Sequence, residues 1–200
     1  QLDLNAVAEI VRLAVLPTRT ERERYHLAQQ ALSRYEALLT RWKNNPDAQL
    51  DILRARIDRL GALYANADYP GVTHEYLALA AAHQAIPDWA IGWVISAYLE
   101  QQDVAAAQTL LARYPGYVPD AEDEQNELFF SLLDTGQYPA ARQYVDRVMQ
   151  HAPWARYNPG DPSAQPNDLW LIGQSLNVQY LTASNALAQA QTLARQLADS

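Results

Sequence analysis

Apolar residues recur along this chain in steps of three and four residues, and the strict alternation that is typical of strands is missing. The spacing predicts ten helices joined by short turns, at about 4–15, 18–43, 46–65, 69–82, from 87 onward, 104–112, 121–135, 138–150, 168–182 and 185–198. We therefore expect an all-α fold.

Two of the turns carry helix-start signals. Thr18 and Glu21 have the spacing of a capping box, in which each side chain accepts a hydrogen bond from the other residue's backbone N–H. This pair predicts the start of the long second helix. Asn45 and Pro46 combine a cap residue with a proline at the first helical position, which predicts the start of the third helix.

The helices repeat in pairs. Tyr69, Val104 and Tyr138 lie 35 and 34 residues apart, which is the period of tetratricopeptide repeats. Three positions after each of them stands a residue at which two helices must approach closely: Val72, Ala107 and Ala141. The period predicts a tetratricopeptide-repeat-like superhelical solenoid of antiparallel helix pairs, and the alternative is a helical bundle without repeats.

We expect one such repeat domain over the whole chain. Its parts are degenerate N-terminal helices over about 1–45, repeats over 46–153, an inserted loop over 154–167 and a C-terminal repeat over 168–200. Because the chain begins with Gln1 and carries no signal peptide, we also expect it to be a fragment of a longer protein.

The first helix of each pair should line the concave face of the solenoid, which is the usual binding surface of such repeats. The register places acids, amides, aromatic rings and other polar groups on this face: Arg54, Asp58, Trp89, Trp93, Ser96, Glu100, Asp123, Asn126, Phe130, Asp134, Ser175 and Gln179. The mixture predicts a polar binding groove with aromatic platforms.

The inserted loop is the least repeat-like segment, and prolines stiffen it. Long loops on rigid scaffolds often carry binding residues. Trp154, Arg156 and Tyr157 have the chemistry to stack on a sugar face and to hydrogen-bond its hydroxyls, and Asp168 and Trp170 follow directly. The alternative is structural, with Trp154 filling the gap between two repeats and Asp168 capping a helix.

Charge changes the picture, because it is unevenly distributed. The net charge is −8, yet residues 1–60 hold ten basic and eight acidic side chains, while residues 61–200 hold five basic and fifteen acidic ones. Such a field repels nucleic acids and anionic lipids and attracts cationic ligands. The plainer interpretation is that acidic helix faces keep the protein in solution.

Residues with catalytic or metal-binding chemistry are scarce. The chain has no Cys, and its four His residues do not have the spacing of a helical metal motif. The acidic cluster over 120–127 is explained by the dipole of the helix that follows. We expect no metal, no cofactor and no enzyme activity, although paired carboxylates across a groove would leave glycoside hydrolysis open.

Six segments in order along the chain resemble the family of outer-membrane exporters of poly-β-1,6-N-acetyl-D-glucosamine, called PgaA or HmsH: Leu16–Tyr25, Arg34–Leu39, Asn45–Asp47, Asp58–Leu63, Trp93–Leu99 and Pro166–Leu171. The likeness runs from about Ile10 to the C-terminus. It implies a periplasmic tetratricopeptide domain that precedes a β-barrel pore of the outer membrane. No strand pattern occurs here, so we expect the barrel outside this chain.

The resemblance also implies a biofilm polysaccharide as cargo and a periplasmic deacetylase as partner. Partly deacetylated polymer carries ammonium groups, which suit the acidic half of the chain. The polymer-binding residues that we expect are Trp89, Trp93, Glu100, Asp123, Asn126, Asp134, Trp154, Arg156, Tyr157, Asp168 and Trp170. The competing hypothesis is a protein-docking module that recruits the deacetylase without binding sugar.

Overall fold

The computed structural model describes residues 2–16, 18–114, 117, 126–151 and 168–198. Within these residues the chain forms ten α-helices, one 3-10 turn and no strand. Their bounds are α1 (Leu2–Ala14), α2 (Glu21–Trp42), η1 (Pro46–Ala48), α3 (Gln49–Ala65), α4 (Tyr69–Ala81), α5 (Asp88–Glu100), α6 (Val104–Arg113), α7 (Asn126–Asp134), α8 (Tyr138–His151), α9 (Asp168–Ala183) and α10 (Leu187–Ala198). The predicted all-α class is confirmed.

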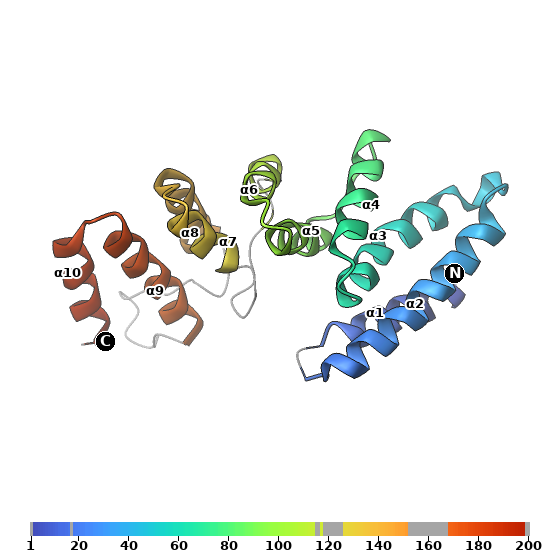
Figure 1. Ribbon diagram of the computed structural model, residues 1–200, viewed down its shortest axis with the longest axis horizontal. Coiled ribbons are helices and arrows are strands. Elements are labelled where there is room, and N and C mark those ends of the chain that lie inside the picture. The colour runs from blue at the N-terminus through green and yellow to red at the C-terminus, as the bar shows by residue number, and fades with distance from the viewer. Residues whose placement is uncertain (1, 17, 115–116, 118–125, 152–167, 199–200) are drawn as a thin grey trace. The chain divides into compact units, whose positions relative to one another are not determined.

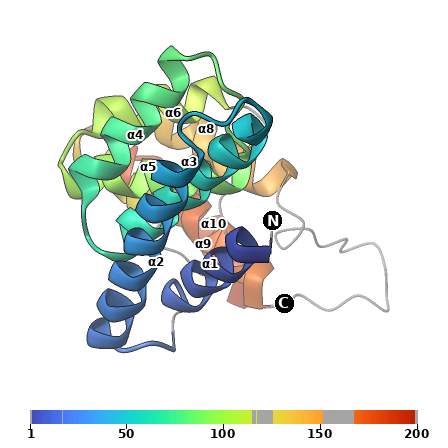
Figure 2. The ribbon, with the colours of Figure 1, turned by 90° about the vertical axis from the view of Figure 1, so that its right-hand side faces the viewer.

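The chain divides into two compact units, Gln1–Asp103 and Val104–Ser200. In the first unit each helix from α1 to α5 packs on the next, and α3 also contacts both α1 and α5. Figure 1 and Figure 2 both show α1 and α2 lying along each other. In the second unit the helices from α6 to α10 likewise pack in chain order. This packing of consecutive helices is consistent with a tetratricopeptide-like arrangement in each unit.

The 34–35-residue register is present in the backbone. Besides His83 in the turn after α4, four turns contain a residue with a left-handed backbone, at Ala67, Gln102, Gly136 and Asn185, with φ between 53° and 71°. Two residues after each of them the next helix begins. The backbone N–H that follows the left-handed residue donates to a carbonyl five residues earlier in every case, over 2.8–3.0 Å. This is the Schellman arrangement, and from Ala67 through Gln102 to Gly136 the same helix stop recurs at the predicted period of 34–35 residues.

The core follows the same register. Val72, Ala107 and Ala141, predicted to lie where helices approach closely, are completely buried.

Ion pairs also join α3 and α4 in the first unit. Arg56 Nε donates to Glu75 Oε1 over 2.6 Å, and Arg59 lies 3.5 Å from the other carboxylate oxygen of Glu75.

In the second unit one side chain on α8 organises the end of α6. The guanidinium of Arg147 donates to the backbone carbonyls of Leu111, Tyr114 and Tyr117 over 3.1–3.4 Å. Carbonyls at a helix end have no partner within the helix, so this one cation satisfies groups that would otherwise be left unpaired. Burial lowers the pKa of Arg147, but a guanidinium stays charged at any physiological pH.

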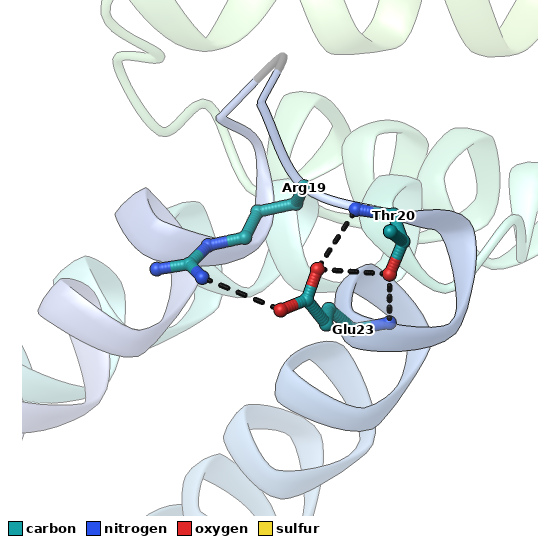
Figure 3. A network of polar contacts seen from close by, with 3 residues as sticks. All are labelled: Arg19, Thr20 and Glu23. Atoms are coloured by element: carbon teal, nitrogen blue, oxygen red, sulfur yellow. Dashed lines mark hydrogen bonds and ion pairs between the residues drawn. The ribbon is translucent and has the colours of Figure 1, made fainter.

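The start of α2 differs from the prediction by two residues. Thr20, not Thr18, caps the helix: its hydroxyl accepts from the Glu23 N–H over 3.3 Å, and the Glu23 carboxylate accepts from the Thr20 N–H over 3.0 Å (Figure 3). Arg19 completes the network with an ion pair of 3.6 Å to Glu23. Both threonines have a glutamate three residues later, so the sequence offers two capping boxes of the same spacing. The structure uses the second one.

Candidate functional site

The N-terminal part of α3 and the start of α5 line a groove of about 360 Å³ in the first unit. We call it the α3–α5 groove. Its lining residues are Leu50, Leu53, Arg54, Ile57, Asp58, Pro87 and Trp89. Arg54, Asp58 and Trp89 were predicted from the sequence to share one binding face, and the structure brings these three together.

Trp89 supplies the aromatic platform of this groove. Its side chain is 55% exposed, which is unusual for so large an apolar ring. One helical turn later Trp93 meets it edge to face, with ring centroids 5.5 Å apart and ring planes at 80°. This contact holds Trp89 at the mouth of the groove, because edge-to-face pairs are a preferred aromatic geometry.

Trp93 is half-buried, and its ring lies flat over Gly61 on α3. A Cβ atom at position 61 would come within 2.6–2.9 Å of three ring atoms, closer than real carbon contacts allow. Gly61 is therefore the residue that lets the ring seat against α3. Trp93 was predicted from the sequence as a binding-face residue, and the structure shows that it packs on α3 and contacts Trp89.

Asp58 and Arg54 form the charged part of the groove. Arg54 Nε lies 3.6 Å from Asp58 Oδ2, and the Arg54 side chain is 51% exposed whereas that of Asp58 is 13% exposed. Burial raises the pKa of the Asp58 carboxyl, and the Arg54 charge opposes that shift. Burial and the Asp58 charge together raise the pKa of Tyr35, whose hydroxyl is buried on α2.

The other predicted site residues are not part of this groove. Glu100 is exposed at the last position of α5, about 16 Å along the helix axis from Trp89. There it helps to raise the pKa of Tyr69, after the larger effect of burial. Asp134 is exposed at the end of α7 and belongs to the second unit.

Several predicted residues fall beyond what the structure describes. Asp123, Trp154, Arg156 and Tyr157 lie outside the described residues. Asn126 begins α7, Asp168 begins α9 and Trp170 lies in the first turn of α9, but their side chains are outside the described part. Their proposed contacts with sugar stay predictions.

One predicted face residue is wrong, and four groove residues were missed. Ser96 is only 4% exposed, because the small side chain is enclosed where α5 packs into the unit. The missed residues are apolar: Leu50, Leu53, Ile57 and Pro87. Leu50 stands four residues before Arg54 and eight before Asp58, so helical spacing places it on the same stripe of α3. That spacing is the signal that would have found it.

Among the residues that the structure describes, no group of three or more His, Cys, Asp or Glu side chains is placed to hold a metal ion. The helices of the same described ranges include none that is both long and apolar enough to cross a membrane.

No family model matches this chain. The chain is 38% identical over 196 residues to the poly-beta-1,6-N-acetyl-D-glucosamine export protein of Escherichia coli strain K12, and equally to the protein of the same name in E. coli O157:H7. The match covers 96% of this chain and 24% of each relative, so the chain spans about a quarter of the length of the curated relatives that it matches. The resemblance seen in the ordered segments is confirmed.

Proposed function

We propose that this chain is a periplasmic binding and scaffold domain of an exopolysaccharide exporter. It guides partly deacetylated poly-β-1,6-N-acetyl-D-glucosamine towards the outer-membrane pore of the full-length protein, as a step in biofilm formation. The cargo is supported by the name of the two relatives, which are export proteins of this polymer. Neither relative is named as an enzyme, and this supports a role without catalysis.

The single observation that carries the proposal is the α3–α5 groove with Trp89 at its mouth. An exposed indole ring is a flat apolar surface, and the C–H face of a pyranose ring is its natural partner. Beside it lie a carboxylate and a guanidinium, which hydrogen-bond hydroxyl or amino groups. The net charge of −8 adds a general attraction for the ammonium groups of a deacetylated polymer.

Export favours weak contacts repeated along the path, because a tightly bound polymer would not move on. The groove fits that requirement, since its volume is only about 360 Å³ and its lining residues Leu50 and Trp89 are exposed. It would hold one or two sugar units, and not a long stretch of polymer.

The second candidate function is docking of the periplasmic deacetylase. The observation in its favour is the apolar side of the groove, where Leu50 is 81% exposed beside Leu53 and Pro87. Exposed apolar residues next to one another are typical of protein-binding surfaces. In this case the groove would take a side chain of the deacetylase and would not bind sugar.

The test is a calorimetric or NMR titration of the 200-residue chain with partly deacetylated and fully acetylated oligomers of equal length. Trp89→Ala should weaken oligomer binding about fivefold, because an aromatic contact contributes roughly 1 kcal/mol. Leu77→Ala is the matched control, since Leu77 is also 55% exposed in the first unit but does not line the groove. If neither oligomer binds while the deacetylase does, the domain is a docking module.

A further inference from the structure

The carboxylate of Asp58 is an unusual feature of the α3–α5 groove. Its side chain is only 13% exposed, and among the described residues Oδ2 has no hydrogen-bond partner. Arg54 Nε is 3.6 Å away, which makes an ion pair but is too long for a hydrogen bond. A buried charged oxygen without a hydrogen bond is costly, so such a group usually has a partner.

Two neighbouring groups interact electrostatically with Asp58, the Tyr35 hydroxyl and the Arg54 guanidinium. On the core side stands the hydroxyl of Tyr35, which is itself buried and makes no hydrogen bond within the described residues. On the groove side stands Arg54, whose side chain is half-exposed and which makes no hydrogen bond and no other ion pair within the described residues. Arg54 is therefore free to swing into solvent, and its departure opens the carboxylate to a donor that enters beside Trp89.

The chemistry of the site favours a primary ammonium group as that donor. An ammonium has three N–H bonds and a full positive charge, so it satisfies a carboxylate oxygen better than a neutral amide does. The nearby indole ring adds attraction for a cation. An N-acetylated amine has lost that charge and keeps a single N–H donor.

We propose that Asp58 recognises the free amino group of a glucosamine unit, and that Arg54 is an internal counter-ion which the ammonium displaces. The inference rests on the proposed function and deepens it, because it assigns the preference for deacetylated units to one carboxylate. Because Arg54 competes for the same carboxylate, it lowers the affinity for glucosamine units. The preference for glucosamine units over N-acetylglucosamine units remains. The arrangement gives the weak, selective and reversible contact that a moving polymer needs.

The decisive experiment measures the affinity of the 200-residue chain for glucosamine oligomers and for N-acetylglucosamine oligomers of the same length, with five variants. Asp58→Asn should weaken glucosamine binding about tenfold and leave the acetylated oligomer unaffected, because a hydrogen bond to a charged group is lost. Asp58→Glu keeps the carboxylate and should keep most of the preference. Asp47→Asn removes the same charge from an exposed site outside the groove and should have little effect.

Arg54→Gln is a more stringent test than Asp58→Asn, because this variant is expected to gain affinity for the glucosamine oligomer. Removal of the competitor should tighten glucosamine binding about two- to fivefold, which is the range of an exposed ion pair. It should not change binding of the acetylated oligomer. Arg113→Gln removes an exposed arginine of the second unit and is the charge-matched control.

The outcomes separate the two levels of the proposal. If the unmodified chain binds neither oligomer, the proposed function fails. If it binds the glucosamine oligomer and Asp58→Asn keeps the preference, or Arg54→Gln weakens binding, the recognition by Asp58 is overturned while the function stands. Circular dichroism of each variant shows whether the helices are intact, and Arg54→Gln alone suffices as a test if Asp58→Asn does not fold.

Discussion

Replacing Gly61 by alanine tests the seat of Trp93, on which the position of Trp89 depends. The new Cβ would stand 2.6 Å from the nearest ring atom, whereas ordinary contact begins at 3.4 Å, so the ring has to retreat by close to 1 Å. Such overpacking costs about 1–3 kcal/mol. Alanine in a helix interior is itself favoured over glycine by about 0.5–1 kcal/mol, so the net expectation is a loss of about 0.5–2 kcal/mol.

The effect of Gly61→Ala on the free energy of unfolding should change sign when the Trp93 ring is absent. In a Trp93→Ala background the new methyl group meets no ring, and Gly61→Ala should then stabilise the first unit by about 0.5–1 kcal/mol. The assay is urea unfolding followed by circular dichroism, with the tryptophan fluorescence of the folded chain, to which Trp89 and Trp93 contribute two of five indole rings, as a second readout. Stabilisation by Gly61→Ala in both backgrounds, with unchanged fluorescence, would refute the contact between Trp93 and α3.

Three further predictions follow from named contacts, and a fourth follows from the acidic face predicted from the sequence. Arg147→Met keeps the packing of the stem but removes three hydrogen bonds to backbone carbonyls, and urea unfolding should show a loss of about 2–3 kcal/mol from the second unit. Thr20→Ala removes the cap of α2 and should cost about 1 kcal/mol in the same assay. Burial raises the pKa of the Asp58 carboxyl, so the folded chain holds this proton more tightly than the unfolded chain does. The contribution of protonated Asp58 to the stability of the fold is therefore present below about pH 4 and is lost as the pH rises through the raised pKa. Thermal melts between pH 3 and 7 should show this loss in the unmodified chain and not in Asp58→Asn. Joint replacement of Asp123 and Asp134 by Asn should weaken binding of the deacetylated oligomer and spare the acetylated one, and loss of deacetylase capture with unchanged oligomer binding would show docking instead.

Much of the backbone could be predicted because the signals are local. Helix formation follows the apolar spacing, and a helix stop depends on a few neighbouring residues. The repeat register was readable for the same reason, since the left-handed residue stands two positions before Tyr69, Val104 and Tyr138. Errors arose where two local signals were equivalent. Two capping boxes overlap before α2, and only the turn after α1 shows which one is used.

The sequence by itself determined that the chain is helical, where its repeats begin and which residue types are available to a polar groove. The tertiary structure decided which of these residues meet. Trp93 faces α3 because Gly61 leaves room for its ring, Ser96 is enclosed, and Leu50 joins Asp58 and Trp89 in one groove. The physical reason is that a side chain's surroundings depend on helices far away in the chain, and a shift of one residue turns a helix face by 100°.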